Sequence, residues 1–462
     1  MGVLEALAAV SRYIPAVEKP ARRPPLPTRL AWTGIVVLLY LIMSEIPLLG
    51  VLGYQQQQAS QALASLILGM NIGSLMTLGI GPIVTAGIVL EVLVGGGLIQ
   101  MDLTKPRDRK IFMGAQRTLA LLFAVLEAAA YAVGCQFWVT TLGGGGCPVG
   151  TGIKLLVVAQ LAFATLILMW FDELVRNGWG IGSALSLFIV ANVVKGLAWQ
   201  FAGPVPVPVG ENQVDYYGWL AHVIKTGDFA ILRHGLPDFV GFLATIAIIM
   251  ILAYFQLMRV YIPVTSPRYG SIKTRIPLNF IYVTNIPILF VGIVVSDIAV
   301  FYQMIAGITG PDSAIAKGLA VLYHYVSPPR GLLEAAADPL RTVIFVIAWL
   351  LLGLFFGFIW VEIAGLSPRQ QAENLIKSGM ELPGLRRNVK LLEKILAKYI
   401  YPLTVISSLL VAGIAVLADI FGAYGTGSGL VLLVGIVYNF YQALAYERTL
   451  EMYPMLQRLI GE

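Results

Sequence analysis

The sequence is poor in charged residues. Only 12% of its 462 residues are charged, whereas a soluble domain has about 25%. Hydrophobic residues make up 58%, and the mean hydropathy is +0.81. A chain of this composition cannot hide its apolar surface inside a water-facing domain. The fold class predicted from composition is therefore an all-α polytopic membrane protein.

Histidine and cysteine are too sparse for a metal or redox centre. The three histidines, His222, His234 and His324, lie in polar connecting segments without ligand spacing, and we expect ordinary surface residues. Cys135 and Cys147 form no metal-binding or redox motif. Both fall on the predicted outer side of the membrane, so the sequence allows a disulfide between them but does not decide whether it forms.

The chain also lacks motifs for catalysis or nucleotide binding. The glycines at 95–97 and 143–146 have neither the lysine nor the spacing of a phosphate-binding loop. No hydrolase, kinase or metalloprotease signature occurs. We therefore expect no enzyme activity, no catalytic residues, no cofactor and no metal.

Hydropathy and helix breakers predict ten membrane spans. They cover residues 30–50, 79–99, 112–135, 152–172, 179–199, 237–258, 277–305, 339–362, 399–419 and 428–446. Lysine and arginine are concentrated in the segments on the side of the two termini, which predicts that both termini are cytoplasmic. Five spans per half would make the halves opposite in orientation, as in inverted repeats.

The connecting segments complete the predicted organisation. An N-terminal segment 1–29 precedes the N-terminal half (30–199), an external loop (200–236) joins it to the C-terminal half (237–446), and a tail (447–462) follows. The N-terminal segment lacks the apolar core of a signal peptide. It is either a short amphipathic helix on the membrane surface, with Leu4, Leu7 and Ile14 on one side, or a partly ordered tail.

Two predicted inner loops, 259–276 and 363–398, are basic and longer than a tether requires. Topology alone would explain their positive charge. Loops of this length are usually functional, which favours docking to a cytosolic partner. The outer connectors 200–236 and 306–338 are mixed in charge, and we interpret them as caps.

One stretch between Glu45 and Glu91 has no charged residue and is broken in the middle. Its segment 59–70 is apolar but too short to cross a membrane, since a span needs about 20 residues. Helix breakers follow at 79–82. Interrupted helices inside a membrane tend to mark the functional centre, so this stretch is a candidate gate.

Carboxylates within predicted spans are costly and therefore candidates for function. They are Glu91, Glu127 and Asp297, and no basic residue lies mid-span to pair with them. A secondary transporter of a small solute would bring Glu127 and Asp297 together at the midplane. The structural alternative is that each is hydrogen-bonded between helices or protonated.

Several motifs occur together in an order that is highly specific. They are Gly79–Gly87 (GIGPIVTAG), Gly114–Arg117 (GAQR), Ser186–Ile189 (SLFI), Tyr254–Gln256 (YFQ), Thr284–Ile288 (TNIPI) and Leu417–Asp419 (LAD) with Gly422-Ala423. Through these motifs the chain resembles the SecY family, the large (alpha) subunits of the Sec protein translocon. The resemblance extends over essentially the whole chain. The resemblance is to the archaeal and eukaryotic branch.

The resemblance implies ten helices in two inverted five-helix halves around an hourglass pore. A plug helix at about 57–70, with Leu63, Leu66, Ile67 and Leu68, would close the pore from outside. Six aliphatic residues would form the pore ring: Ile80, Val84, Leu185, Ile189, Leu289 and Leu432. Aliphatic side chains can exclude water and ions and still yield to a passing chain.

The resemblance also implies a lateral gate and a set of partners. Thr85, Glu127 and Asp297 would lie at the gate, between spans two and three and spans seven and eight. The inner loops would bind the translating ribosome through the three arginines Arg268, Arg386 and Arg387. SecE-like and Sec-beta-like small membrane subunits would complete a heterotrimer in the plasma membrane. This heterotrimer would also contact signal peptides, nascent chains and membrane lipids.

The expected function is passive conduction of unfolded secretory polypeptides, with lateral release of apolar segments into the bilayer. The alternative is the secondary transporter. The residues that line the pore distinguish the channel from the transporter. A transporter needs converging polar groups, which the aliphatic ring does not offer.

Overall fold

The computed structural model describes residues 2–22, 24–51, 73–95, 99, 101, 105–134, 137–138, 149–208, 214–266, 272–283, 285–310, 312–377 and 389–452. Apart from two short hairpins, the regular structure in these ranges is helical. Ten helices coincide with the predicted spans: α2 (Leu26–Glu45), α4 (Gly81–Gly95), α5 (Pro106–Val133), α6 (Thr151–Leu174), α7 (Ala184–Ala202), α9 (Phe239–Leu257), α10 (Ile286–Thr309), α13 (Pro339–Ile363), α15 (Val389–Ile420) and α16 (Gly427–Met452). The all-α membrane fold class is confirmed.

Within the described residues, nine helices are long and apolar enough to cross a membrane. The helix α4, at the second predicted span, has 15 residues and is shorter. Its start at Gly81 follows a turn in which Gly79 adopts a φ of +54°. That backbone conformation suits glycine, and it ends the preceding segment where the sequence predicts a break.

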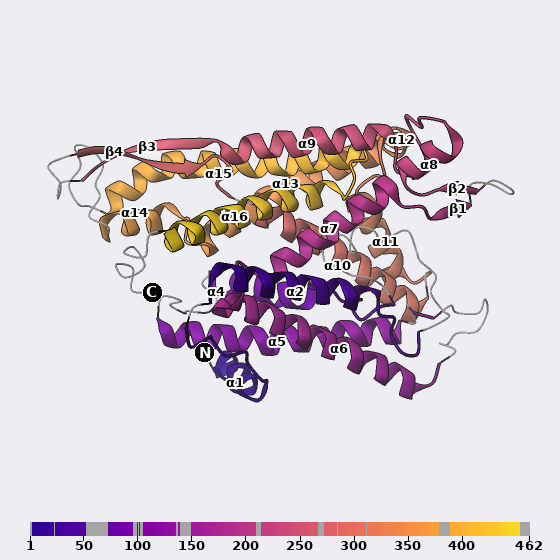
Figure 1. The fold of residues 1–462 in the computed structure, drawn as a ribbon, viewed down its shortest axis with the longest axis horizontal. Helices are drawn as coiled ribbons and strands as arrows, with labels where there is room; N and C mark the ends of the chain where they lie inside the picture. The colour runs from indigo at the N-terminus through magenta and orange to yellow at the C-terminus, as the bar shows by residue number, and fades with distance from the viewer. Residues whose placement is uncertain are drawn as a thin grey trace.

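The helices of the two halves lie on opposite sides of the molecule (Figure 1). Helices α2, α4, α5 and α6 lie on one side, and α9, α13, α15 and α16 lie on the other. Helix α7 packs against α16, and α10 packs against α4, α5 and α16. These contacts join the halves along two different seams.

Each end of the helix bundle carries its own small elements (Figure 1). At the β3–β4 end lie α1 (Gly2–Val10), the 3-10 turn η1 (Ser11–Tyr13), the hairpin of β3 (Arg259–Ser266) and β4 (Ile272–Asn279), and α14 (Pro368–Lys377). At the α8 end lie β1 (Pro206–Pro208), β2 (Val214–Tyr216), α8 (Trp219–Thr226), α11 (Ala314–Val326) and α12 (Leu332–Ala337).

The seventh span begins later than the sequence predicts. Residues 277–279 belong to β4, which pairs antiparallel with β3 in a register that places Asn279 opposite Arg259. Helix α10 begins only at Ile286, with Asn285 at the N-cap position. Hydropathy alone misses this boundary because the apolar residues of a strand raise the average just as those of a helix do.

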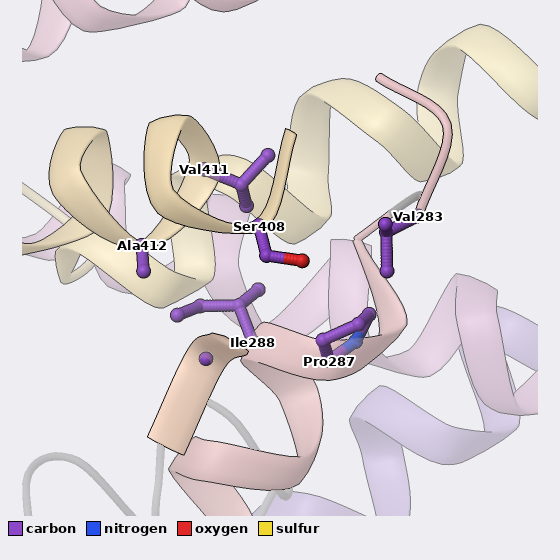
Figure 2. Close-up of a pocket in the computed structure, with 7 residues that line it drawn as sticks. Val283, Pro287, Ile288, Ser408, Val411 and Ala412 are labelled. Carbon is purple, nitrogen blue, oxygen red and sulfur yellow. The ribbon is translucent and has the colours of Figure 1, made fainter. Parts of the chain in front are cut away.

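Helices α13 and α15 approach closely at small residues. A Cβ built on Gly357 would lie 2.1 Å from Ser408 Oγ, and one on Gly353 would lie 2.9 Å from Ala412 Cβ. Small residues four apart let helix backbones pack in contact within a membrane. Beside this crossing lies a small pocket (Figure 2), lined by Val283, Pro287, Ile288, Gly353, Ser408, Val411 and Ala412.

Candidate functional site

The six predicted ring residues come from four helices. Ile80 and Val84 lie at the start of α4, Leu185 and Ile189 at the start of α7, Leu289 in the first turn of α10, and Leu432 in the second turn of α16. All six belong to one hydrophobic cluster. Ile80, Ile189 and Leu432 are buried, and the other three are half-buried. This cluster is the main core of the bundle and includes residues of both halves.

Helix starts position these side chains. Glycines with positive φ precede two of the ring helices: Gly182 (+76°) lies before α7, and Gly425 (+78°) lies before α16. The start of α10 is fixed against α16 by a close contact: a Cβ on Gly435 would lie 1.2 Å from Asn285 Nδ2. Only glycine leaves room there. This contact sets α10 beside α16, where Leu289 and Leu432 lie.

The backbone on both sides of the predicted plug is fixed. Leu48 N donates to Gly73 O at 2.8 Å, and Leu75 N donates to Ile46 O at 3.0 Å. The buried hydroxyl of Thr77 donates to Ser74 O at 2.6 Å and accepts from Gly73 N at 3.1 Å. Residues 46–48 and 73–75 are therefore held together. The plug residues Leu63, Leu66, Ile67 and Leu68 lie outside the described residues.

The predicted gate residues lie on three helices that meet. Thr85 is on α4, Glu127 on α5 and Asp297 on α10, and α10 contacts both α4 and α5. Glu127 and Asp297 thus lie on neighbouring helices, and the buried Tyr131 lies one turn beyond Glu127. Thr85 Oγ1 is buried with no hydrogen-bond partner among the described residues. Helix α4 also contacts α13, so the helices expected to flank the gate touch one another.

The three predicted docking arginines, Arg268, Arg386 and Arg387, lie outside the described residues, as do Cys135 and Cys147. The elements that flank these arginines are described. The β3–β4 hairpin is tied to α16 by Arg259, whose guanidinium donates to Tyr438 Oη at 2.9 Å. The hairpin and α14 lie at the same end of the molecule (Figure 1).

A polar cluster at the α8 end was not found from the sequence. His222, predicted to be an ordinary surface residue, is buried and hydrogen-bonded to Asp215. Arg233 pairs with the same carboxylate at 2.7 Å. Burial alone would raise the pKa of Asp215, but hydrogen bonds from His222, the Tyr216 backbone and Arg233 outweigh it and lower that pKa. These residues have no motif spacing, so only folding brings them together.

An aromatic cluster covers the seam between α7 and α16 at this end. Trp219 of α8 and Tyr424, just before α16, are buried in one hydrophobic cluster. Tyr424 Oη donates to Asp238 O at 2.7 Å, and the amide of Gly425 donates to Gln200 Oε1 at 2.7 Å. The second hydrogen bond joins α7 of one half to the turn before α16 of the other.

Comparison with known proteins agrees with this architecture. The SecY family model matches residues 74–441. The protein translocase subunit SecY of Aeropyrum pernix is 47% identical over 464 residues, covering 100% of this chain and 99% of the relative. A solved protein-conducting channel has a TM-score of 0.78 at 33% identity, covering 96% of this chain and 98% of its own.

A second solved structure is Sec61 in a canine ribosome–channel complex from the endoplasmic reticulum. It has a TM-score of 0.76 at 32% identity and covers 96% of this chain and 98% of its own. The resemblance seen in the motifs is confirmed over the full chain: the protein is a member of the SecY family.

Proposed function

We propose that this chain is a passive protein-conducting channel. It translocates unfolded secretory polypeptides across the membrane and releases transmembrane segments laterally into the bilayer. Relatives that match it end to end are named protein translocase subunits, and the solved structures most like it include a protein-conducting channel. The chain is not an enzyme. A partner must supply the driving force, because the sequence has no nucleotide-binding motif.

The observation that carries the proposal is the purely aliphatic character of the predicted ring. Its six members come from both halves and lie in one hydrophobic cluster. Side chains without hydrogen-bonding groups form no fixed contacts with a passing polypeptide and can close behind it by excluding water. The segment at about 57–70 would close this ring as a plug, since residues 46–48 and 73–75 on either side of it are held together.

The alternative of a small-solute transporter has one observation in its favour. Glu127 and Asp297 lie on the neighbouring helices α5 and α10, and that alternative needs the two carboxylates close together. Both lie on the gate helices α5 and α10, however, and the ring itself offers no polar group to bind a solute. The family match therefore favours the channel, with the two carboxylates at its lateral gate between α4–α5 and α10–α13.

The proposed setting follows from charge and from the relatives. The β3–β4 end, with both described chain ends, would face the cytoplasm of a plasma membrane, because the basic loops lie there. The ribosome would dock there through Arg268, Arg386 and Arg387, since structures of similar channels are ribosome complexes. SecE-like and Sec-beta-like subunits would complete a heterotrimer.

Ion conductance tests the ring. Replacing Leu289 with serine should raise the leak of planar bilayers that contain the purified complex, because a hydroxyl lets water enter the closed ring. The matched control is Leu351→Ser on α13, a side chain that is 61% exposed on the membrane-facing surface. A leak that is equal in both variants would refute the ring assignment.

A further inference from the structure

The N-terminal segment of the chain is a strap fixed to the edge of the bundle. The strap comprises residues 2–22. Figure 1 shows its helix α1 beside α5 at the β3–β4 end. Leu4 is buried with Leu90 of α4 and Ala115 of α5. A Cβ on Gly114 of α5 would lie 3.2 Å from Ala8 Cα, so α1 and α5 are in close contact. The apolar side of α1 thus packs on protein.

Side chains of the bundle hold the backbone that follows α1. Pro15 O accepts hydrogen bonds from Trp170 Nε1 at 2.8 Å and from Arg117 at 3.3 Å. Glu18 O accepts one from Trp179 Nε1 at 2.9 Å. Each contact gives a partner to a carbonyl that no helix or strand satisfies. The strap is therefore preorganised, and its outward side chains are held in place.

The outward side of the strap carries both apolar and basic groups. Val10 is 52% exposed and Tyr13 is 90% exposed. The cations Arg12, Lys19 and Arg22 are exposed as well, and none forms an ion pair within the described residues. Glu18 is the single acidic residue between positions 10 and 22, so this face has a net positive charge.

Helix α5, on which the strap lies, also exposes apolar and basic side chains. Met113, next to the Gly114 contact, is 50% exposed, and Leu122 and Leu126 further along α5 are 45% and 56% exposed. Exposed basic residues Arg109 and Lys110 lie in the first turns of α5. Tyrosine beside apolar residues, flanked by lysine and arginine, is the pattern of a segment lying at the membrane–water interface.

We propose that residues 10–22 form an interfacial binding site for anionic phospholipid headgroups. Val10 and Tyr13 would enter the headgroup region, and Arg12, Lys19 and Arg22 would pair with phosphate. The lipid-binding proposal depends only on the chain spanning a membrane. It does not depend on the proposed channel function, so either proposal can fail without the other. Because the strap binds α5, a bound headgroup would also hold the β3–β4 end of a gate helix.

A fluorescent probe on the strap tests this directly. The full-length protein, with Cys135 and Cys147 replaced by serine, carries Tyr13→Cys labelled with bimane in liposomes of phosphatidylglycerol and phosphatidylcholine. Either lipid is supplied in brominated form as a quencher. We expect brominated phosphatidylglycerol to quench the probe more strongly than brominated phosphatidylcholine at equal mole fraction. A second label at Val10→Cys repeats the comparison with Tyr13 intact.

Charge removal supplies the decisive comparison. In the triple variant Arg12→Gln, Lys19→Gln and Arg22→Gln, the phosphatidylglycerol content for half-maximal quenching should rise at least fivefold, because the loss of even one cation near an anionic surface weakens binding by about that factor. The matched control removes three exposed lysines at the same end of the other half, Lys377, Lys394 and Lys398, and should leave the curve unchanged. Equal quenching by both lipids, no quenching at all, or equal shifts in both variants would each overturn the proposal.

Discussion

Arg29 of α2 and Glu447 of α16 form an ion pair of 2.7 Å that joins the first span of one half to the last span of the other. The side chains are only 10% and 15% exposed. Arg29 Nε also donates to Gly180 O at 3.0 Å, which brings in the turn before α7. The helices of this seam, α2, α7 and α16, are distinct from the gate helices. One seam is therefore held by an ion pair, and the proposed lateral gate lies at the other.

Breaking this ion pair should destabilise the protein. Glu447→Gln leaves the arginine without its counter-charge in a mostly buried site, and we expect a loss of about 1–3 kcal/mol. The measurement is the midpoint of thermal unfolding in detergent, followed by the fluorescence of a dye that binds unfolded chains. The control is Glu45→Gln: Glu45 pairs with Lys195 but is 68% exposed, so its loss should be small. Equal effects of the two variants would contradict this role of the ion pair.

A disulfide across the second seam should hold the gate shut. A Cβ on Gly134, at the end of α5, would lie 3.4 Å from Met304 Cα on α10. With the native cysteines replaced by serine, the pair Gly134→Cys and Met304→Cys should cross-link under mild oxidation, because α5 and α10 are in contact at these two positions. Insertion of membrane segments should stop and return on reduction. Undiminished insertion in fully cross-linked protein would show that α5 and α10 need not part.

Removing one carboxylate from the gate should favour its closed state. In the wild type, α5 and α10 each carry an acidic group at the gate, Glu127 and Asp297. Asp297→Asn replaces one of them with an amide, which can donate a hydrogen bond to Glu127. In the background of Gly134→Cys and Met304→Cys, we expect the engineered cross-link to form several times faster with Asp297→Asn than without it. Gln303→Glu, which adds an acidic group to α10 nearby, serves as the comparison for a general effect of charge. An unchanged rate in Asp297→Asn would show that the two carboxylates do not control the contact.

The α13–α15 crossing should not tolerate a side chain at Gly357. An alanine Cβ would overlap Ser408 Oγ, and we expect Gly357→Ala to cost about 1–3 kcal/mol through forced separation of the helices. Ser408→Gly in the same chain should recover much of the loss. Gly413→Ala on α15 is the control, because its Cβ would meet nothing within 4 Å. That variant should be neutral or slightly stabilising, as alanine favours the helix.

The cluster at the α8 end should give a stability that depends on acid. Because the folded state lowers the pKa of Asp215, its contribution is present above the ordinary value of 3.8 and is lost as the pH falls further through the folded pKa. Asp215→Asn should therefore lower the free energy of unfolding at pH 7 by about 1–2 kcal/mol. The difference in this free energy between the variant and the wild type should shrink below pH 4. A constant difference from pH 7 to pH 3 would contradict this role.

The sequence by itself determined the class of the protein and the location of its spans. Ten apolar runs separated by glycine, proline and charge fix helices that must satisfy their own backbone in a membrane, whatever their neighbours are. The break at 79–82 and the aliphatic identities of Ile80 and Val84 are local facts of the same kind. The ordered motifs then identified the family before any contact was known.

Only the tertiary structure decided which distant residues meet. Arg29 and Glu447 are separated by most of the chain, and Asp215, His222 and Arg233 have no spacing that predicts a cluster. The sequence left open whether the N-terminal segment is a surface helix or a partly ordered tail, and the structure shows the apolar face of α1 packed on α4 and α5. Hydropathy cannot tell these environments apart, because lipid tails and a protein interior are equally apolar. The partner of an apolar face is set by packing, which depends on the whole fold.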